Sequence, residues 1–143
     1  GGQDDIVRLV NRVRALQDFL GTEDGANLLT GYRRAASIVE AEEKKDGVAY
    51  EGEPDVKFAD QEEERALFAA LDRAEPAIDA ALETEDFTGA MAELARLRGP
   101  VDAFFEAVLV NAENRIVRRN RLCLLNRVRG VMQRVAVWDE IEG

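Results

Sequence analysis

Histidine is absent from the 143-residue chain, and cysteine occurs only once. Without histidine, no Ser-His-Asp or Cys-His arrangement can form, and no His or Cys cluster can bind zinc. A single thiol cannot form an internal disulfide bond, which favours a cytoplasmic protein. Cys123 stands between two leucines, so we predict a packing residue and not a nucleophile. These absences predict a chain with no catalytic residues and no metal site of its own.

Long apolar runs and proline are also scarce. No stretch approaches the roughly 20 apolar residues that cross a membrane, and no signal peptide is visible. Apolar residues nevertheless make up 46% of the chain, which is typical of a globular protein. The length predicts one domain over residues 1–143 with a self-sufficient core. Because the chain starts with Gly-Gly and not Met, we expect a fragment of a larger protein.

Helical periodicity of apolar residues runs through most of the chain and predicts an all-α bundle of about five to six helices. The expected helices cover residues 3–20, 23–45, 60–83, 87–98, 100–107 and 114–138. Pro76 should end or kink the third of them, because proline clashes with the preceding turn. The 100–107 helix should bury Phe104 and Phe105. Residues 46–59 combine glycines and a proline without helical periodicity, which predicts an internal loop. We expect the isolated domain to be monomeric.

Charge is distributed unevenly along the chain, although the net charge is −10. Residues 46–113 carry 5 basic and 18 acidic groups, whereas residues 114–143 carry 7 basic and 3 acidic groups. Salt screens exposed charges over about 10 Å, so a local anion-binding surface remains possible on an acidic protein.

The stretch from Asn114 to Trp138 holds seven arginines and no acidic residue. At about 100° per residue, its apolar residues fall on one side of a helix: Val117, Leu124, Val128, Val131, Val135 and Trp138. Four arginines fall roughly opposite: Arg115, Arg118, Arg119 and Arg129. The pattern predicts a long amphipathic helix with its apolar side in the core and a cationic side that can meet an anionic protein or nucleic acid.

Three stretches resemble a known family: EDGANLLTGYRRAASIVE at 23–40, LRGPVDAFFEAVLVNAE at 97–113 and RRNRLCLLNRVRGVMQRVA at 118–136. They are similar to the C-terminal domain of the bacterial glycyl-tRNA synthetase β subunit, an α-helical anticodon-binding module named DALR that arginyl-tRNA synthetase also contains. Ile116 and Val117 stand where the Asp-Ala-Leu-Arg tetrad has Ala and Leu, so Arg118 is the tetrad residue retained.

The resemblance implies a function in attaching glycine to its tRNA. In that family two α and two β subunits form a heterotetramer, the α subunit activates glycine with ATP and magnesium, and the terminal β domain reads the anticodon of glycine tRNA. The expected partners of this chain are therefore glycine tRNA, the rest of the β subunit and the α subunit, with no membrane. The ligase activity would belong to the holoenzyme, and no cofactor is expected in this domain.

Anticodon bases are read by hydrogen bonds and by stacking on aromatic or guanidinium planes. With few aromatics, the chain is expected to use arginine and asparagine. The candidate tRNA-binding residues are Arg33, Arg34, Arg118, Asn120, Arg121 and Arg129, with Asn126 as a further base reader. Arg118 and Arg129 are favoured by the polar side of the last helix. One of Arg33 and Arg34 is expected in an ion pair, and Arg121 suits a buried ion pair as well as it suits RNA.

Two other hypotheses remain. The chain could be an acidic helical protein–protein interaction module whose acidic face, residues 60–93, binds a basic partner. Alternatively, it could be the equivalent domain of an arginyl-tRNA synthetase.

Overall fold

The computed structural model describes residues 2–135, and every element in this range is helical. The α-helices are α1 (Gly2–Leu20), α2 (Glu23–Asp46), α3 (Glu62–Glu83), α4 (Phe87–Ala95), α5 (Arg98–Ala107) and α6 (Arg115–Gln133). A short 3-10 helix, η1 (Val56–Phe58), lies between α2 and α3. The predicted all-α fold of five to six helices is confirmed. Trp138, which was placed on the apolar side of the last helix, lies outside the described residues.

Side-chain caps explain why several helices begin where they do. The side chains of Thr22, Asp86 and Asn114 accept hydrogen bonds from the first-turn N–H groups of α2, α4 and α6. Such N–H groups have no partner inside their own helix, so a cap contributes about 0.5–2 kcal/mol. Gly47 ends α2 in the left-handed conformation that glycine adopts without strain.

Two helix boundaries differ from the prediction. The 87–98 helix ends at Ala95, and the next helix starts at Arg98, ahead of Pro100, because proline is tolerated in a first turn that lacks intrahelical partners. Pro76 does not end α3, which continues to Glu83. Pro76 and Asp72, whose carbonyl loses its N–H partner, are both exposed, so water can replace the missing hydrogen bond.

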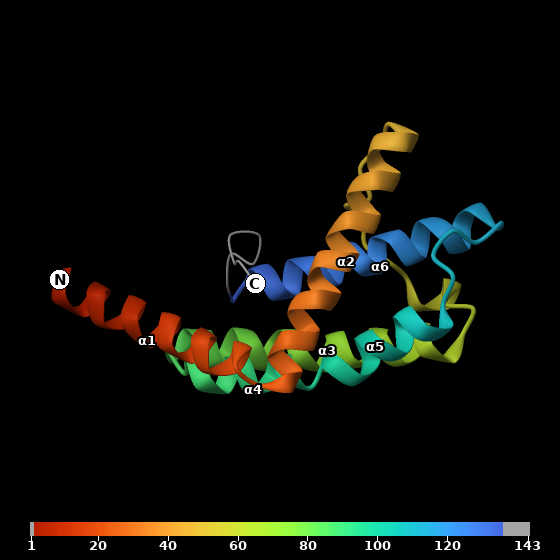
Figure 1. Cartoon of the computed structure of the whole chain (residues 1–143). Helices are drawn as coiled ribbons and strands as arrows, with labels where there is room; N and C mark the ends of the chain where they lie inside the picture. The colour runs from red at the N-terminus through yellow and green to blue at the C-terminus, as the bar shows by residue number, and fades with distance from the viewer. Residues whose placement is uncertain (1, 136–143) are drawn as a thin grey trace.

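The core is formed where α2 and α6 lie above α3, α4 and α5. Figure 1 shows α2 rising steeply across α6, while α3, α4 and α5 run beneath them and α1 extends to one side. The largest fully buried side chains include Tyr32, Phe104, Leu67, Ile78 and Leu124. Gly31 allows α2 to approach α5 closely, since a Cβ there would lie 3.1 Å from Val101.

The middle of α6 differs from the expected two-sided pattern. Residues 120–125 are buried all the way round, because α2, α3 and the connection between them surround this part of the helix. Leu124, Val128, Val131 and Val135 join the main core as predicted, and Leu122 and Cys123 form a second small cluster with Tyr50. In this middle part, the side of α6 opposite the main core therefore faces α2 and the loop after it and not solvent.

Candidate nucleic-acid interface

Most arginines of α6 and its C-terminal end form ion pairs inside the domain. Of the seven arginines in the 114–138 stretch, five pair with carboxylates of α2, of α3 or of Asp60 shortly before α3: Arg118, Arg121, Arg127, Arg129 and Arg134. The acidic middle of the chain and its basic end therefore neutralise each other across helix–helix contacts. This arrangement corrects the prediction of an open cationic side on the last helix.

Arg118 lies in a network of four hydrogen-bond acceptors. Its Nη2 is 2.7 Å from both Glu42 Oε1 and Asp46 Oδ2, its Nη1 donates to the Tyr50 hydroxyl, and its Nε donates to Asn111. Glu42, followed by Asp46, raises the pKa of the Arg118 guanidinium. The same network lowers the pKa of Asp46, first through the Tyr50 hydroxyl and then through Arg118. Arg118 is thus a cross-link between α6 and the end of α2.

Arg129 also faces α2 and not solvent. Its Nη2 lies 3.4 Å from Glu40 Oε1, and its side chain is 16% exposed. Arg118 and Arg129 point away from the main core of α6, as the helical wheel predicts, but α2 occupies that side. The periodicity of one helix cannot show that a second helix covers its polar side.

Arg121 forms a buried ion pair, one of the two alternatives that its sequence position left open. Its Nη2 is 2.8 Å from Glu64 Oε1, and both side chains are almost fully buried. Glu64 also accepts hydrogen bonds from the N–H groups of Asp60 and Gln61 at the start of α3, while Arg121 donates to the Leu109 carbonyl. The pair therefore connects α6, the N-terminus of α3 and the connection before α6.

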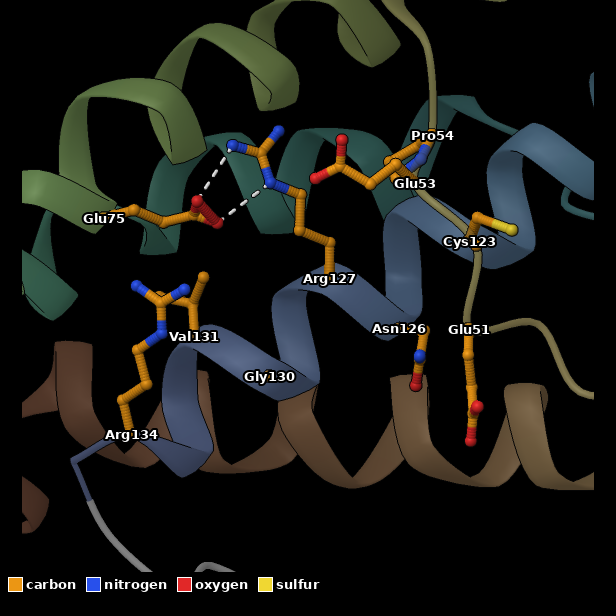
Figure 2. A pocket seen from close by; sticks show the side chains of 11 residues that line it. Glu51, Glu53, Pro54, Glu75, Cys123, Asn126, Arg127, Gly130, Val131 and Arg134 are labelled. Carbon is orange, nitrogen blue, oxygen red and sulfur yellow. Dashed lines mark hydrogen bonds and ion pairs between the residues drawn. The ribbon is translucent and has the colours of Figure 1, made fainter.

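Arg127 joins α6 to α3 beside a polar hollow. It donates two hydrogen bonds to the Glu75 carboxylate and a third to Asp72, and Figure 2 shows it projecting from α6 to Glu75. Glu75 is the first cause of the raised pKa of Arg127. The hollow has a volume of about 270 Å³ and is also lined by Asn126 and by Glu51 and Glu53 of the loop. These carboxylates make it a poor place for a phosphate group.

Asn120, a predicted base reader, holds the loop. Its side-chain oxygen accepts from the N–H of Asp55 at 2.8 Å, and its Nδ2 donates to the Asp55 carbonyl at 3.0 Å. Asn120 is 5% exposed. The loop predicted at 46–59 spans the interval from Gly47 to Gln61, and this clamp ties it to α6 just before η1.

Arg33 and Arg34 are the two candidate residues that the structure places on the surface. The Arg34 guanidinium carbon lies 4.5 Å from the centre of the Phe105 ring, so the cation sits on an aromatic face. A hollow of about 210 Å³ adjoins this pair and is lined in part by Asn27 and Thr30 and by the acidic Asp102 and Glu106. Phe105 is only partly buried, in contrast to the prediction, because it packs beside the core at its edge.

The sequence alone did not identify Phe105 as a candidate site residue. Its partner Arg34 lies far away in the chain, on another helix. The Phe104-Phe105 pair was a signal of burial, and Phe104 is indeed fully buried. Two adjacent helical residues point about 100° apart, however, so both rings cannot enter the core equally. The spacing alone could have indicated that one ring stays near the surface.

Arg115 and Arg119 lie at the N-terminal end of α6 and are exposed. Within residues 2–135, neither of them nor Arg34 forms an ion pair. Cys123 is buried, and burial raises the pKa of its thiol, which fits the predicted packing role. In the described part of the chain, no group of metal-binding side chains gathers and no helix is apolar enough to cross a membrane.

The domain is thus a helical bundle in which most arginines of the last helix are paired with carboxylates of neighbouring helices. A few cationic side chains remain exposed at the surface. The sequence of the domain matches the model of the DALR anticodon binding domain over residues 28–136. Because this match covers most of the chain, the protein belongs to the DALR anticodon-binding domain family. The family predicted from the three motifs is confirmed.

Three similar proteins are all subunits of one kind of enzyme. The chain is 58% identical over 142 residues to the glycine–tRNA ligase beta subunit of Dinoroseobacter shibae, and 55% identical over 142 residues to that of Paracoccus denitrificans. It is 56% identical over 144 residues to the beta subunit of Rhodospirillum centenum. These alignments cover 99–100% of this chain but only 20–21% of each relative. The chain therefore spans about a fifth of the length of the curated relatives it matches.

Proposed function

We propose that this chain is the anticodon-binding domain of a glycine–tRNA ligase β subunit and that it recognises the anticodon of glycine tRNA. The observation that carries the proposal is the identity of more than half of the residues, over the whole chain, with subunits of that name. These relatives all carry the name glycine–tRNA ligase beta subunit, which favours this subunit over an arginyl-tRNA synthetase. The pairing of α3 carboxylates with arginines of α6 and its C-terminal end weighs against an acidic docking module, because several of those carboxylates, among them the buried Glu64, are used inside the domain.

The proposed RNA-contacting residues are Arg33 and Arg34 on α2. A base freed from its stack can lie against a guanidinium plane, and the Arg34–Phe105 pair offers such a plane in an exposed position. The hydrogen bonds of Arg118, Asn120, Arg121 and Arg129 support a structural role, since a contact with RNA would have to break some of them.

The proposed setting is the holoenzyme that the family resemblance implies. The domain contributes tRNA recognition to an assembly of two α and two β subunits in the cytoplasm. ATP and magnesium act in the α subunit, and the domain itself functions without a cofactor. The support for this setting is the name that the relatives carry, glycine–tRNA ligase beta subunit.

The test compares Arg34→Ala with a matched control, Arg73→Ala, in the full β subunit together with its α partner. Arg73 is an exposed arginine of α3, far from Phe105 in the sequence. Affinity is measured for glycine tRNA and for a tRNA with an altered anticodon, over a range of salt concentrations. Loss of a stacked or hydrogen-bonded base should weaken binding of the native tRNA by about 1–3 kcal/mol and reduce the discrimination between the two tRNAs.

The salt dependence separates base contacts from phosphate contacts. If Arg33 contacts a phosphate, Arg33→Ala should weaken the binding of both tRNAs equally. It should also reduce the slope of log affinity against log salt concentration by about one unit. If both variants bind the two tRNAs with wild-type affinity and discriminate between them as the wild type does, the surface around Arg33 and Arg34 does not recognise the anticodon. Arg115 and Arg119 would then be the exposed cations to replace next.

A further inference from the structure

The first half of α1 exposes a stripe of large apolar side chains. Ile6, Val7, Leu9, Val10 and Val13 are between 44% and 63% exposed. Positions 6, 9, 10 and 13 repeat at intervals of three and four, so they share one side of the helix. Exposed apolar residues are usually scattered singly over a protein surface. A contiguous apolar surface of this kind therefore indicates an interaction site.

The stripe continues into the core of the domain. Leu16 and Leu20, further along the same side of α1, pack against the main core, and Phe19 is buried in it. The same helical face is therefore covered by α2 and α4 in its second half and uncovered in its first half. Figure 1 shows the first half of α1 extending beyond the other helices. Because this apolar side packs against the core in one half and is exposed in the other, we expect a second surface to cover the exposed half.

The charged side of α1 is already used within the domain. Arg8 pairs with Glu85 at 2.7 Å, and Arg12 donates to the carbonyls of Arg134 and Val135 at the end of α6. The uncovered side of the first half of α1 is mainly aliphatic, with Arg14 at its edge, so it suits an apolar protein surface better than the phosphates of RNA.

Helix α1 also lies outside residues 28–136, the part that the family model matches. The relatives align with α1 as well as with the domain, and they are about five times longer than this chain. An element that the β subunits share, but that lies outside the family match, is suited to connect the domain to the rest of that subunit.

We infer that the exposed stripe of α1 docks against an apolar surface in another part of the same β-subunit polypeptide and so fixes the position of the anticodon-binding domain. This inference rests on the proposed function, because it takes the chain to be part of a longer β subunit. It adds to that function a contact that orients the domain relative to the remainder of the subunit.

The test places a photo-reactive phenylalanine analogue at Leu9 of the full-length β subunit, assembled with its α partner from a mixture of isotope-labelled and unlabelled β subunits. The matched control carries the analogue at Asn11, which is about 200° further round the helix. Asn11 lines a hollow with Glu85 and Asp86, so its cross-links should map to the turn between α3 and α4. This control shows that the photoreaction works on α1.

Cross-links from Leu9 to peptides outside the 143-residue domain, within one β polypeptide, would support the inference. Cross-links between labelled and unlabelled β subunits, cross-links to the α subunit, or no cross-link from Leu9 would each overturn it. As a second measurement, Leu9→Glu in the same assembly should lose the hydrogen-exchange protection of residues 5–13, whereas Asn11→Glu should retain it. Equal protection in both variants would also contradict the docking. Neither readout uses tRNA, so its outcome is separate from that of the anticodon-binding test.

Discussion

The helices α1 and α6 have the same length, 19 residues, and each combines an apolar stripe with arginines, yet the fold uses them in opposite ways. The middle of α6 is buried on every side, and four of the six arginines of this helix pair with carboxylates of α2 and α3. On α1, the apolar residues of the first half are exposed, and burial begins only at Ala15. The comparison teaches that an amphipathic pattern identifies a helix but not the number of neighbours that will cover it.

The largest expected effect comes from breaking the buried ion pair of α6. Arg121→Met leaves the fully buried Glu64 carboxylate without its charged partner, so the free energy of unfolding should fall by about 3–5 kcal/mol. Urea denaturation of the 143-residue chain measures the change. Arg115→Met is the matched control on the same helix and should change stability by less than about 0.5 kcal/mol, because Arg115 is exposed. Equal stability of the two variants would contradict the assignment of Arg121 as a structural cross-link.

A second pair of substitutions compares the two apolar stripes directly. Leu124→Ala removes a fully buried side chain and should lower the free energy of unfolding by about 2–5 kcal/mol. Leu9→Ala removes a side chain that is 63% exposed and should have an effect below about 0.5 kcal/mol in the isolated domain. Thermal or urea unfolding of both variants measures the difference. A large loss from Leu9→Ala in the isolated domain would mean that its stripe is covered within the domain itself.

Removing the clamp between Asn120 and the loop should have a smaller and more local effect. Asn120→Ala leaves the N–H and carbonyl of Asp55 without these partners, which should destabilise the loop by about 1–3 kcal/mol. Amide hydrogen exchange should accelerate at Asp55 and its neighbours, while the amides of α5 keep their protection. If instead all helices lose protection together, the clamp contributes to global stability and not only to the loop.

The smallest expected effect is a change in titration and not in fold. The Tyr50 hydroxyl and Arg118 hold the pKa of Asp46 below its ordinary value. The ionised Asp46 therefore stabilises the folded state at a pH above that ordinary value, and this contribution is lost as the pH falls through the lowered pKa. Arg118→Gln removes one of these two causes, and the pKa of Asp46 should rise toward its ordinary value. Carboxyl carbon chemical shifts followed by NMR measure it. An unchanged pKa would show that Arg118 does not contribute to the lowered pKa of Asp46.

The helices and the family could be predicted from sequence because both depend on short-range patterns. Caps such as Thr22 and Asn114 lie beside the turns that they stabilise, and the motif around Pro100 is contiguous. The roles of the arginines could not be predicted in the same way. Arg118 meets Glu42 and Arg127 meets Glu75 across long sequence separations, and helical periodicity gives the side of a helix but not its neighbour. Of the candidate RNA contacts, Arg33 and Arg34 are the two that remain exposed.

The hydrogen bonds from Arg12 to the end of α6 have a consequence for how this module is cut from a longer protein. The boundary of the family match, at residue 28, excludes Arg12 together with the buried Phe19. A recombinant piece that starts at that boundary would leave the last carbonyls of α6 without a cationic partner and would open one wall of the core. The family match and the packed core therefore have different N-terminal limits, and a recombinant piece that keeps this core whole begins upstream of Arg12.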